Sequence, residues 1–206
     1  MIGRHRLTAV CATGLLVLLG ACSGGDDGGD PPSDEPTASS EASQPGADLP
    51  SGWTEQQLED LRLGIPGGFE GAPAQRTDEG SQTTFTATDG SEVPARIDVF
   101  VESGRVGTLE IRGGLLRSRA EAELGADVED PTPIDVRGAS EAEQFFYTYD
   151  IEASEGSTSI RQVDLLVDPP GLPKYGVRYA APADAFDDDL WEQLRSSVFV
   201  EDAPDA

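Results

Sequence analysis

The sequence is poor in cysteine and histidine, and each scarcity excludes a class of protein. The two cysteines are Cys11 and Cys22 and the single histidine is His5, so all three lie within the first 22 of 206 residues. A chain that loses this leader has no histidine, which excludes the Ser-His-Asp and Cys-His catalytic arrangements and the usual zinc sites. It also has at most one cysteine, and therefore no internal disulfide.

A long apolar run is also missing. The apolar core of the leader, Leu7–Leu19, has 13 residues and reaches 15 when it is counted to Ala21, fewer than the roughly 20 that cross a bilayer as a helix. It ends in Leu19-Gly20-Ala21-Cys22, which is the pattern of a bacterial lipobox. We therefore expect residues 1–21 to be a signal peptide, and Cys22 to carry the lipid that anchors the protein on the extracytoplasmic face of the cell membrane.

Residues 22–50 are predicted to be a tether. Beyond the lipidated Cys22, Leu49 is the only large apolar residue, and the rest is Gly, Ser, Thr, Ala, Pro, acid and the single Gln44. Such a composition cannot bury enough surface to offset the loss of chain entropy, so we expect this segment to be disordered. Its seven carboxylates repel one another and anionic lipid, which favours an extended spacer.

Cations are scarce in the remaining segment, 51–206, which is long enough for a single globular domain. It has 12 basic residues against 32 acidic ones, a net charge of −20. Nucleic acid is excluded as an expected partner, because its binding requires clustered cations. No glycine-rich phosphate loop or dinucleotide-binding motif occurs, and we expect no cofactor.

Hydrophobic periodicity in this segment predicts mostly strands. Alternation of apolar and polar residues indicates strands at 61–65, 97–101, 143–151, 160–167 and 175–181. Turn residues separate several of them, so we expect hairpins. The pattern predicts an α+β fold with a central antiparallel sheet and helices packed on its faces.

Three segments are predicted as helical. Trp53–Leu58 suggests a short helical lead-in. The stretch 105–124 fits either a hairpin or a helix, and because Gly113-Gly114 would cost a helix about 1 kcal/mol each, we expect helix only over 114–124. The last helix is expected to start at Pro182 and Asp184, with apolar residues four apart facing the sheet.

Several short motifs resemble a known family. They are Pro66-Gly67-Gly68-Phe69 after the first strand, Gly138-Ala139, Tyr175–Tyr179 leading into Ala181–Asp184, and Ser196–Phe199. Over about 53–200 the chain resembles the PsbP-like fold and, within it, the LpqN-type lipoproteins of actinobacteria. The resemblance implies an αβα sandwich and a non-catalytic role as an accessory or adaptor subunit on a larger assembly, and it brings no catalytic residues.

Acidic clusters are the remaining candidate sites. Asp127–Asp130 and Asp187–Asp189 offer oxygen ligands for calcium, but neither has EF-hand spacing, so we expect no metal site. Asp184, Asp187, Asp188 and Asp189 form an acidic face that we expect to be solvated and available to a basic partner. The same carboxylates also suit the start of a helix, where they favour the positive end of its dipole.

Three functions remain open at this point. The first is an anchored accessory module, not an enzyme, that binds another cell-envelope protein. The second is a carrier of lipid or another small ligand, and the third is a carboxylate-based glycoside hydrolase. An apolar pocket lined from the sheet would favour the carrier, two facing buried carboxylates the hydrolase, and a closed core with an exposed patch the adaptor.

Overall fold

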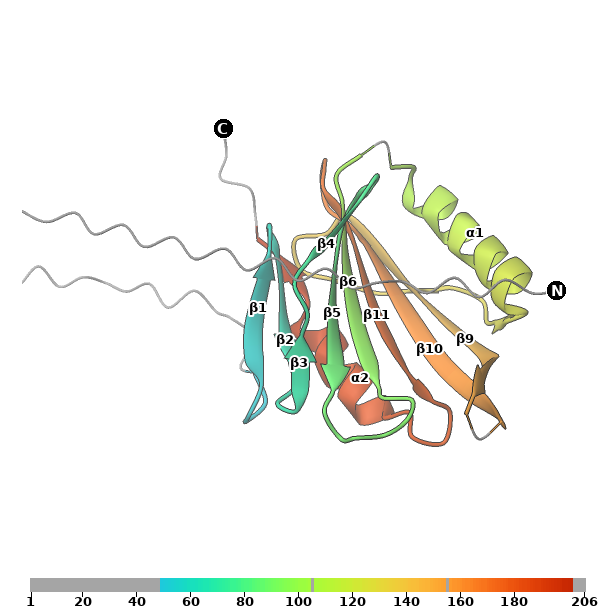
Figure 1. The fold of residues 1–206 in the computed structure, drawn as a ribbon. Helices are drawn as coiled ribbons and strands as arrows, with labels where there is room; N and C mark the ends of the chain where they lie inside the picture. Colours follow the sequence, from blue (N-terminus) through green and yellow to red (C-terminus); the bar gives the residue numbers. More distant parts are fainter. Residues whose placement is uncertain (1–48, 105, 155, 202–206) are drawn as a thin grey trace, which may run out of the picture. The chain divides into compact units, whose positions relative to one another are not determined.

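The computed structural model describes residues 49–104, 106–154 and 156–201, which form a mostly antiparallel sheet with two α-helices (Figure 1). The predicted signal peptide, the lipidation site Cys22 and nearly all of the tether lie outside these residues. No helix of the described segments is long and apolar enough to cross a membrane. The elements are β1 (Thr54–Leu58), β2 (Leu61–Ile65), β3 (Phe69–Gly71), β4 (Gln75–Thr77), β5 (Gly80–Ala87), β6 (Arg96–Glu102), α1 (Leu109–Arg119), the π-helical turn η1 (Ala120–Leu124), β7 (Asp127–Val128), β8 (Thr132–Pro133), β9 (Glu141–Ala153), β10 (Gly156–Asp168), β11 (Lys174–Pro182), α2 (Asp188–Ser197) and β12 (Phe199–Val200).

The larger sheet has nine strands in the order β3-β5-β6-β11-β10-β9-β7, with β4 added on β5 and β8 on β9. Every pair in it is antiparallel. The four later strands predicted from period-two alternation are confirmed as β6, β9, β10 and β11, which lie side by side. The expected α+β class with a mostly antiparallel sheet is therefore confirmed.

The main core lies on one face of this sheet. Alternate residues of the central strands, such as Val99, Leu165 and Val177, are at most 1% exposed. They pack against side chains of β2 and α2, namely Leu61, Leu63, Trp191 and Leu194. Burial of these apolar side chains is the principal source of stability in the fold.

A second, three-stranded sheet, β1-β2-β12, lies over the same core. The predicted strand at 61–65 is confirmed as β2, but the helical lead-in at Trp53–Leu58 is wrong, because Thr54–Leu58 is strand β1. The chain reverses at Glu59, which has a positive φ of 55°, and β1 then pairs with β2 from Thr54↔Ile65 to Leu58↔Leu61. Pairing with the buried strand β2 outweighs the helix propensity of residues 54–58.

Helix α1 packs on the opposite face of the large sheet, where Leu109 contacts Phe145 of β9 and Leu166 of β10. The α-helix begins at Leu109, in the half of 105–124 for which the sequence fits either a hairpin or a helix, and ends at Arg119. The prediction of helix over 114–124 is therefore only partly right, because the helix starts earlier and residues 120–124 form the π-helical turn η1. Gly113 explains why: a Cβ there would lie 2.6 Å from the ring of Phe145. The glycine that weakens the isolated helix is what lets it approach the sheet.

Helix α2 is shorter than predicted. Strand β11 continues to Pro182, a turn follows in which the Ala185 N–H donates to the Pro182 carbonyl at 2.9 Å, and the helix begins at Asp188. Pro182 and Asp184 are therefore outside it. Asp187 is the N-cap residue, and its carboxylate accepts a hydrogen bond from the Leu190 N–H at 2.9 Å.

Candidate functional site

The four carboxylates of the predicted acidic face lie at or just before the start of α2. Asp184, Asp187, Asp188 and Asp189 are all exposed, as expected, but two of them have partners within the domain. Asp187 caps α2, and Asp188 forms an ion pair with Arg161 at 3.0 Å. Asp187 and Asp188 therefore stabilise the start of the helix, where carboxylates favour the positive end of its dipole.

The other acidic cluster is equally dispersed. Asp127 is exposed in the two-residue strand β7, and the side chain of Asp130 is 97% exposed and pairs with Arg117 at 3.3 Å. Within the described segments, no group of three or more metal-ligating side chains comes together.

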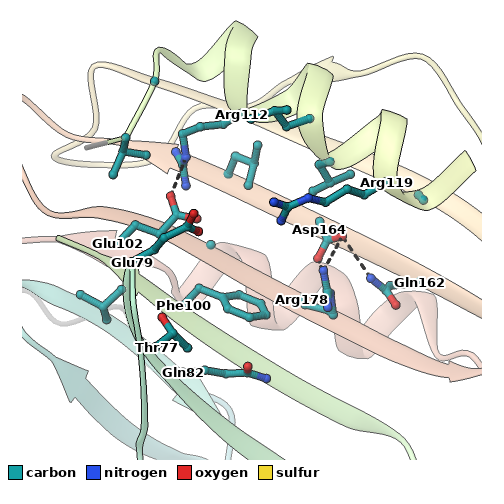
Figure 2. Close-up of a pocket in the computed structure, with 18 of the residues that line it drawn as sticks. Thr77, Glu79, Gln82, Phe100, Glu102, Arg112, Arg119, Gln162, Asp164 and Arg178 are labelled. Carbon is teal, nitrogen blue, oxygen red and sulfur yellow. Dashed lines mark hydrogen bonds and ion pairs between the residues drawn. The ribbon is translucent and has the colours of Figure 1, made fainter. Parts of the chain in front are cut away.

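The structure instead contains a cleft of about 560 Å³ between α1 and the sheet face on which α1 packs. Figure 2 shows side chains converging on it from the helix above and from the strands below. Its apolar lining includes Phe100, Leu115, Leu116 and Leu166, and its charged lining includes Glu79, Glu102, Arg112, Arg119, Glu123, Asp164 and Arg178. We call this space the cleft.

One end of the cleft floor is a network around Asp164 of β10. Its side chain is 4% exposed and accepts hydrogen bonds from Arg178 Nε at 2.7 Å and Nη2 at 3.3 Å. Gln162 donates to it at 3.1 Å, and the hydroxyl of Tyr147 donates as well. Strand pairing fixes this geometry, because Asp164↔Arg178 and Gln162↔Tyr147 are direct cross-strand neighbours.

The protonation states of this network follow from burial. Burial raises the pKa of Tyr147 far above its ordinary value, and the Asp164 charge adds to the effect, so the phenol stays a donor. Burial alone would lower the pKa of Arg178, but Asp164 reverses the direction and the pKa is raised. The floor therefore carries a fixed pair of opposite charges.

A second ionic cluster holds the helix against the sheet at the other end. Arg112 of α1 is buried; its Nε lies 2.8 Å from Glu102, its Nη1 pairs with Asp168, and its Nη2 donates to the Tyr175 carbonyl at 2.8 Å. Lys174 lies 3.4 Å from the same Asp168. These contacts join α1 to β6, β10 and β11 and fix the width of the cleft.

A third buried carboxylate, Asp98 of β6, lies on the same face. It accepts hydrogen bonds from Thr84 at 2.6 Å and Gln82 at 3.0 Å, and Arg96 lies 2.9 Å from its other oxygen. Asp98 and Asp164 are thus separately neutralised and do not form a facing carboxylate pair. The paired carboxylates of a glycoside hydrolase are therefore not formed by Asp98 and Asp164.

The sequence analysis missed all of the residues that line this cleft. A signal was present, because Gln162 and Asp164 lie at alternate positions beside the apolar residues Val163 and Leu165. Alternating polar residues usually face solvent, yet Gln162 and Asp164 are only 3% exposed. Helix α1 covers the face of β10 that carries these polar residues, and the sequence of β10 alone does not show that a helix lies there.

Comparisons with known proteins address the fold only. No family model matches the sequence, and no curated protein matches it. The solution structure of cyanobacterial PsbP from Synechocystis is similar, with a TM-score of 0.51 and 12% identity over 76% of this chain and 96% of that one. The crystal structure of a Pseudomonas aeruginosa protein of unknown function has a TM-score of 0.44 and 14% identity over 68% and 92%, too distant to carry an argument. The first similarity confirms that the fold is PsbP-like.

Proposed function

We propose that this protein is a lipid-anchored, non-catalytic binding protein of the cell envelope, which takes a small ligand into the cleft between α1 and the sheet. The single observation that carries the proposal is the cleft itself. Its volume, about 560 Å³, is within the roughly 300–1,000 Å³ of small-molecule sites, which combine an apolar lining with a few fixed polar groups. A gap left by imperfect packing would not be expected to have a floor of hydrogen-bonded charged side chains such as Asp164 and Arg178.

The lining supports an amphiphilic ligand. Phe100 lies in the floor, and Gly176 beside it on β11 adds no side chain to the space. Leu115 and Leu116 come from α1, and Leu115 is 54% exposed, so apolar surface continues from the cleft to its mouth. The Arg178 guanidinium lies 5.0 Å above the Phe100 ring, so the charged and the apolar lining of the cleft are in direct contact there.

The anchor and the family assignment are part of the same proposal. Leu19-Gly20-Ala21-Cys22 supports processing before Cys22 and lipidation of its sulfur, which would hold the domain at the extracytoplasmic face of the membrane. The LpqN-type assignment is supported by the combination of this lipobox with a PsbP-like fold. The αβα layering is supported by α1 and α2, which pack against opposite faces of the large sheet.

A second candidate function is docking on another envelope protein. It is supported by the outer surface of α1 and η1, where Ile111, Leu115 and Leu124 are 54%, 54% and 44% exposed. Exposed apolar residues that cluster on one element are typical of interaction sites. Leu115 and Leu124 also line the cleft, so a partner bound there would cover its mouth.

Photoaffinity labelling of the full chain in membranes tests the cleft. An uncharged alkyl alcohol that carries a diazirine should, on irradiation, label peptides from α1, β6 and β10. Gly176→Leu should abolish this labelling, because a Cβ at Gly176 would meet Phe100 at an ordinary 3.4 Å and the longer side chain would occupy the cleft.

Gly114→Leu is the matched control, because a Cβ there has nothing within 4 Å. It makes the same chemical change on the outer side of α1 and should leave the labelling unchanged. Labelling spread evenly over the domain, or equal in both variants, would contradict a ligand site in the cleft.

A further inference from the structure

Arg119, in the last turn of α1, differs from the other cations of the cleft. It lines the cleft and is exposed, and no residue in the described part of the chain forms a hydrogen bond or ion pair with its side chain. Figure 2 shows its guanidinium extending from the helix toward Asp164 and Arg178. Glu123, one turn further on, is not within ion-pair distance, although that spacing often allows pairing.

Arg178 has spare donor capacity at the same end. Its Nε and Nη2 donate to Asp164, whereas no described acceptor binds Nη1, and the side chain keeps 26% of its surface exposed. Arg178 can therefore donate to a ligand without leaving Asp164. A guanidinium held in this way loses little conformational freedom on binding, which favours recognition of an anion.

Four carboxylates line the cleft, and two of them, Asp164 and Glu102, are already neutralised, whereas Glu123, one turn from Arg119, has no ion-pair partner among the described residues and opposes an anion. Both oxygens of Asp164 already accept hydrogen bonds from Arg178 and Gln162, and Glu102 is held by Arg112. The net charge of −20 slows the approach of an anion at long range, but charges beyond about 8 Å are largely screened in physiological salt.

The apolar part of the lining begins beside Arg178, whose guanidinium lies 5.0 Å from the centre of the Phe100 ring. Phe100 of β6 and Leu166 of β10 form the floor, and Leu116 of α1 lies on the opposite wall. A ligand that filled this space would have one charged end and an uncharged body.

We propose that the cleft binds an amphiphile with one anionic group, a carboxylate or a phosphate, held between Arg119 and Arg178, with its apolar body along Phe100, Leu116 and Leu166. Guanidinium groups suit both anions, because their N–H donors match two oxygens at once. This inference rests on the proposed function and adds the chemical class of the ligand.

Four photoaffinity probes with the same diazirine alkyl body test it in membranes that hold the full chain. Their head groups are a carboxylate, a phosphate monoester, an alcohol and a trimethylammonium. The two anions should label the cleft at about tenfold lower concentration than the alcohol, the effect of one charge-assisted hydrogen bond. Arg119→Gln should remove this advantage and leave labelling by the alcohol unchanged.

Arg117→Gln is the matched control, because it removes the same charge from the same helix but its side chain is directed to Asp130 and the carbonyl of Val128. Anion labelling should persist in it. Equal labelling of the cleft by all four probes, or a preference for the ammonium, would overturn the anionic ligand and leave the cleft as a site.

Labelling of the cleft by none of the probes would instead overturn the proposed function. Inorganic phosphate is added as a competitor to distinguish a free anion from an anionic head group. If it displaced the alkyl phosphate at equal concentration, the apolar body would not be required and the amphiphile would be excluded.

Discussion

Replacing Asp164 by asparagine should destabilise the domain markedly, because it removes the charge that neutralises Arg178 on the cleft floor. Asp164 is 3% exposed and receives donors from three side chains: Arg178, Gln162 and Tyr147. Asparagine has nearly the same shape, so the cavity and the strand pairing are retained. What changes is that a guanidinium with an elevated pKa is left without its closest counter-charge.

The size of the effect follows from the exposure of the pair. Removing one partner of a buried ion pair costs about 3–5 kcal/mol. Arg178 keeps 26% of its surface exposed and also feels the charge of Asp98, so the lower end of that range applies. A loss of about 3 kcal/mol corresponds to a fall in Tm of roughly 6–12 °C for a domain of this size.

A double-mutant cycle with Arg178→Met isolates the interaction from the two single changes. Urea unfolding can be followed by the fluorescence of Trp191, which is 1% exposed and lies on the other face of the sheet. Asp164→Asn with Arg178→Met should be more stable than the sum of the single losses predicts, by about 2 kcal/mol. If the two losses add to within about 0.5 kcal/mol, the pair is not coupled and the reasoning fails.

Three further predictions follow from single features. Gly113→Ala should destabilise the domain, because a Cβ would lie 2.6 Å from the Phe145 ring, whereas Gly114→Ala, with nothing within 4 Å, should stabilise it by about 1 kcal/mol in urea unfolding. Burial raises the pKa of all four tyrosines, that of Tyr175 from 10.0 to about 12. The native state therefore keeps phenol protons that the unfolded chain loses near pH 10. The contribution of the tyrosines to stability should be fully present below that pH and be lost as the pH rises toward 12, and a flat profile between pH 9 and 12 would contradict this. Intact-mass measurement should find lipid on Cys22 at the start of the mature chain, and Cys22→Ala should leave an unprocessed form; cleavage at another position would remove the anchor.

The central strands could be predicted from the sequence because their alternation reports burial directly. Val163, Leu165 and Val167 alternate with Gln162 and Asp164, and the first three face the main core. Period-two alternation cannot distinguish a polar face that meets water from one covered by a helix. The network at Asp164 therefore could not be found without the position of α1.

The start of α1 could not be predicted because the deciding contact is tertiary. The helix propensity of Gly113 argues against helix, and by itself that argument is sound. The close approach to Phe145 reverses the conclusion, because any larger residue would push α1 away from the sheet and widen the cleft. The terminal helix was located more easily, since the Asp187 cap and the buried pair Trp191 and Leu194 are encoded within it.

The acidic composition predicts a partner surface at the start of α2, and none of its carboxylates lines the cleft. Net charge describes the long-range field, which steers association, but it does not locate a site. The exposed carboxylates at the start of α2 are numerous, yet Asp187 caps the helix and Asp188 pairs with Arg161. In a domain with 12 basic residues, an arginine directed into a cleft without a partner among the described residues is the rarer feature, and Arg119 is such a residue. The proposed ligand site therefore rests on a minority charge that lacks a partner among the described residues, and not on the place where the majority charge accumulates.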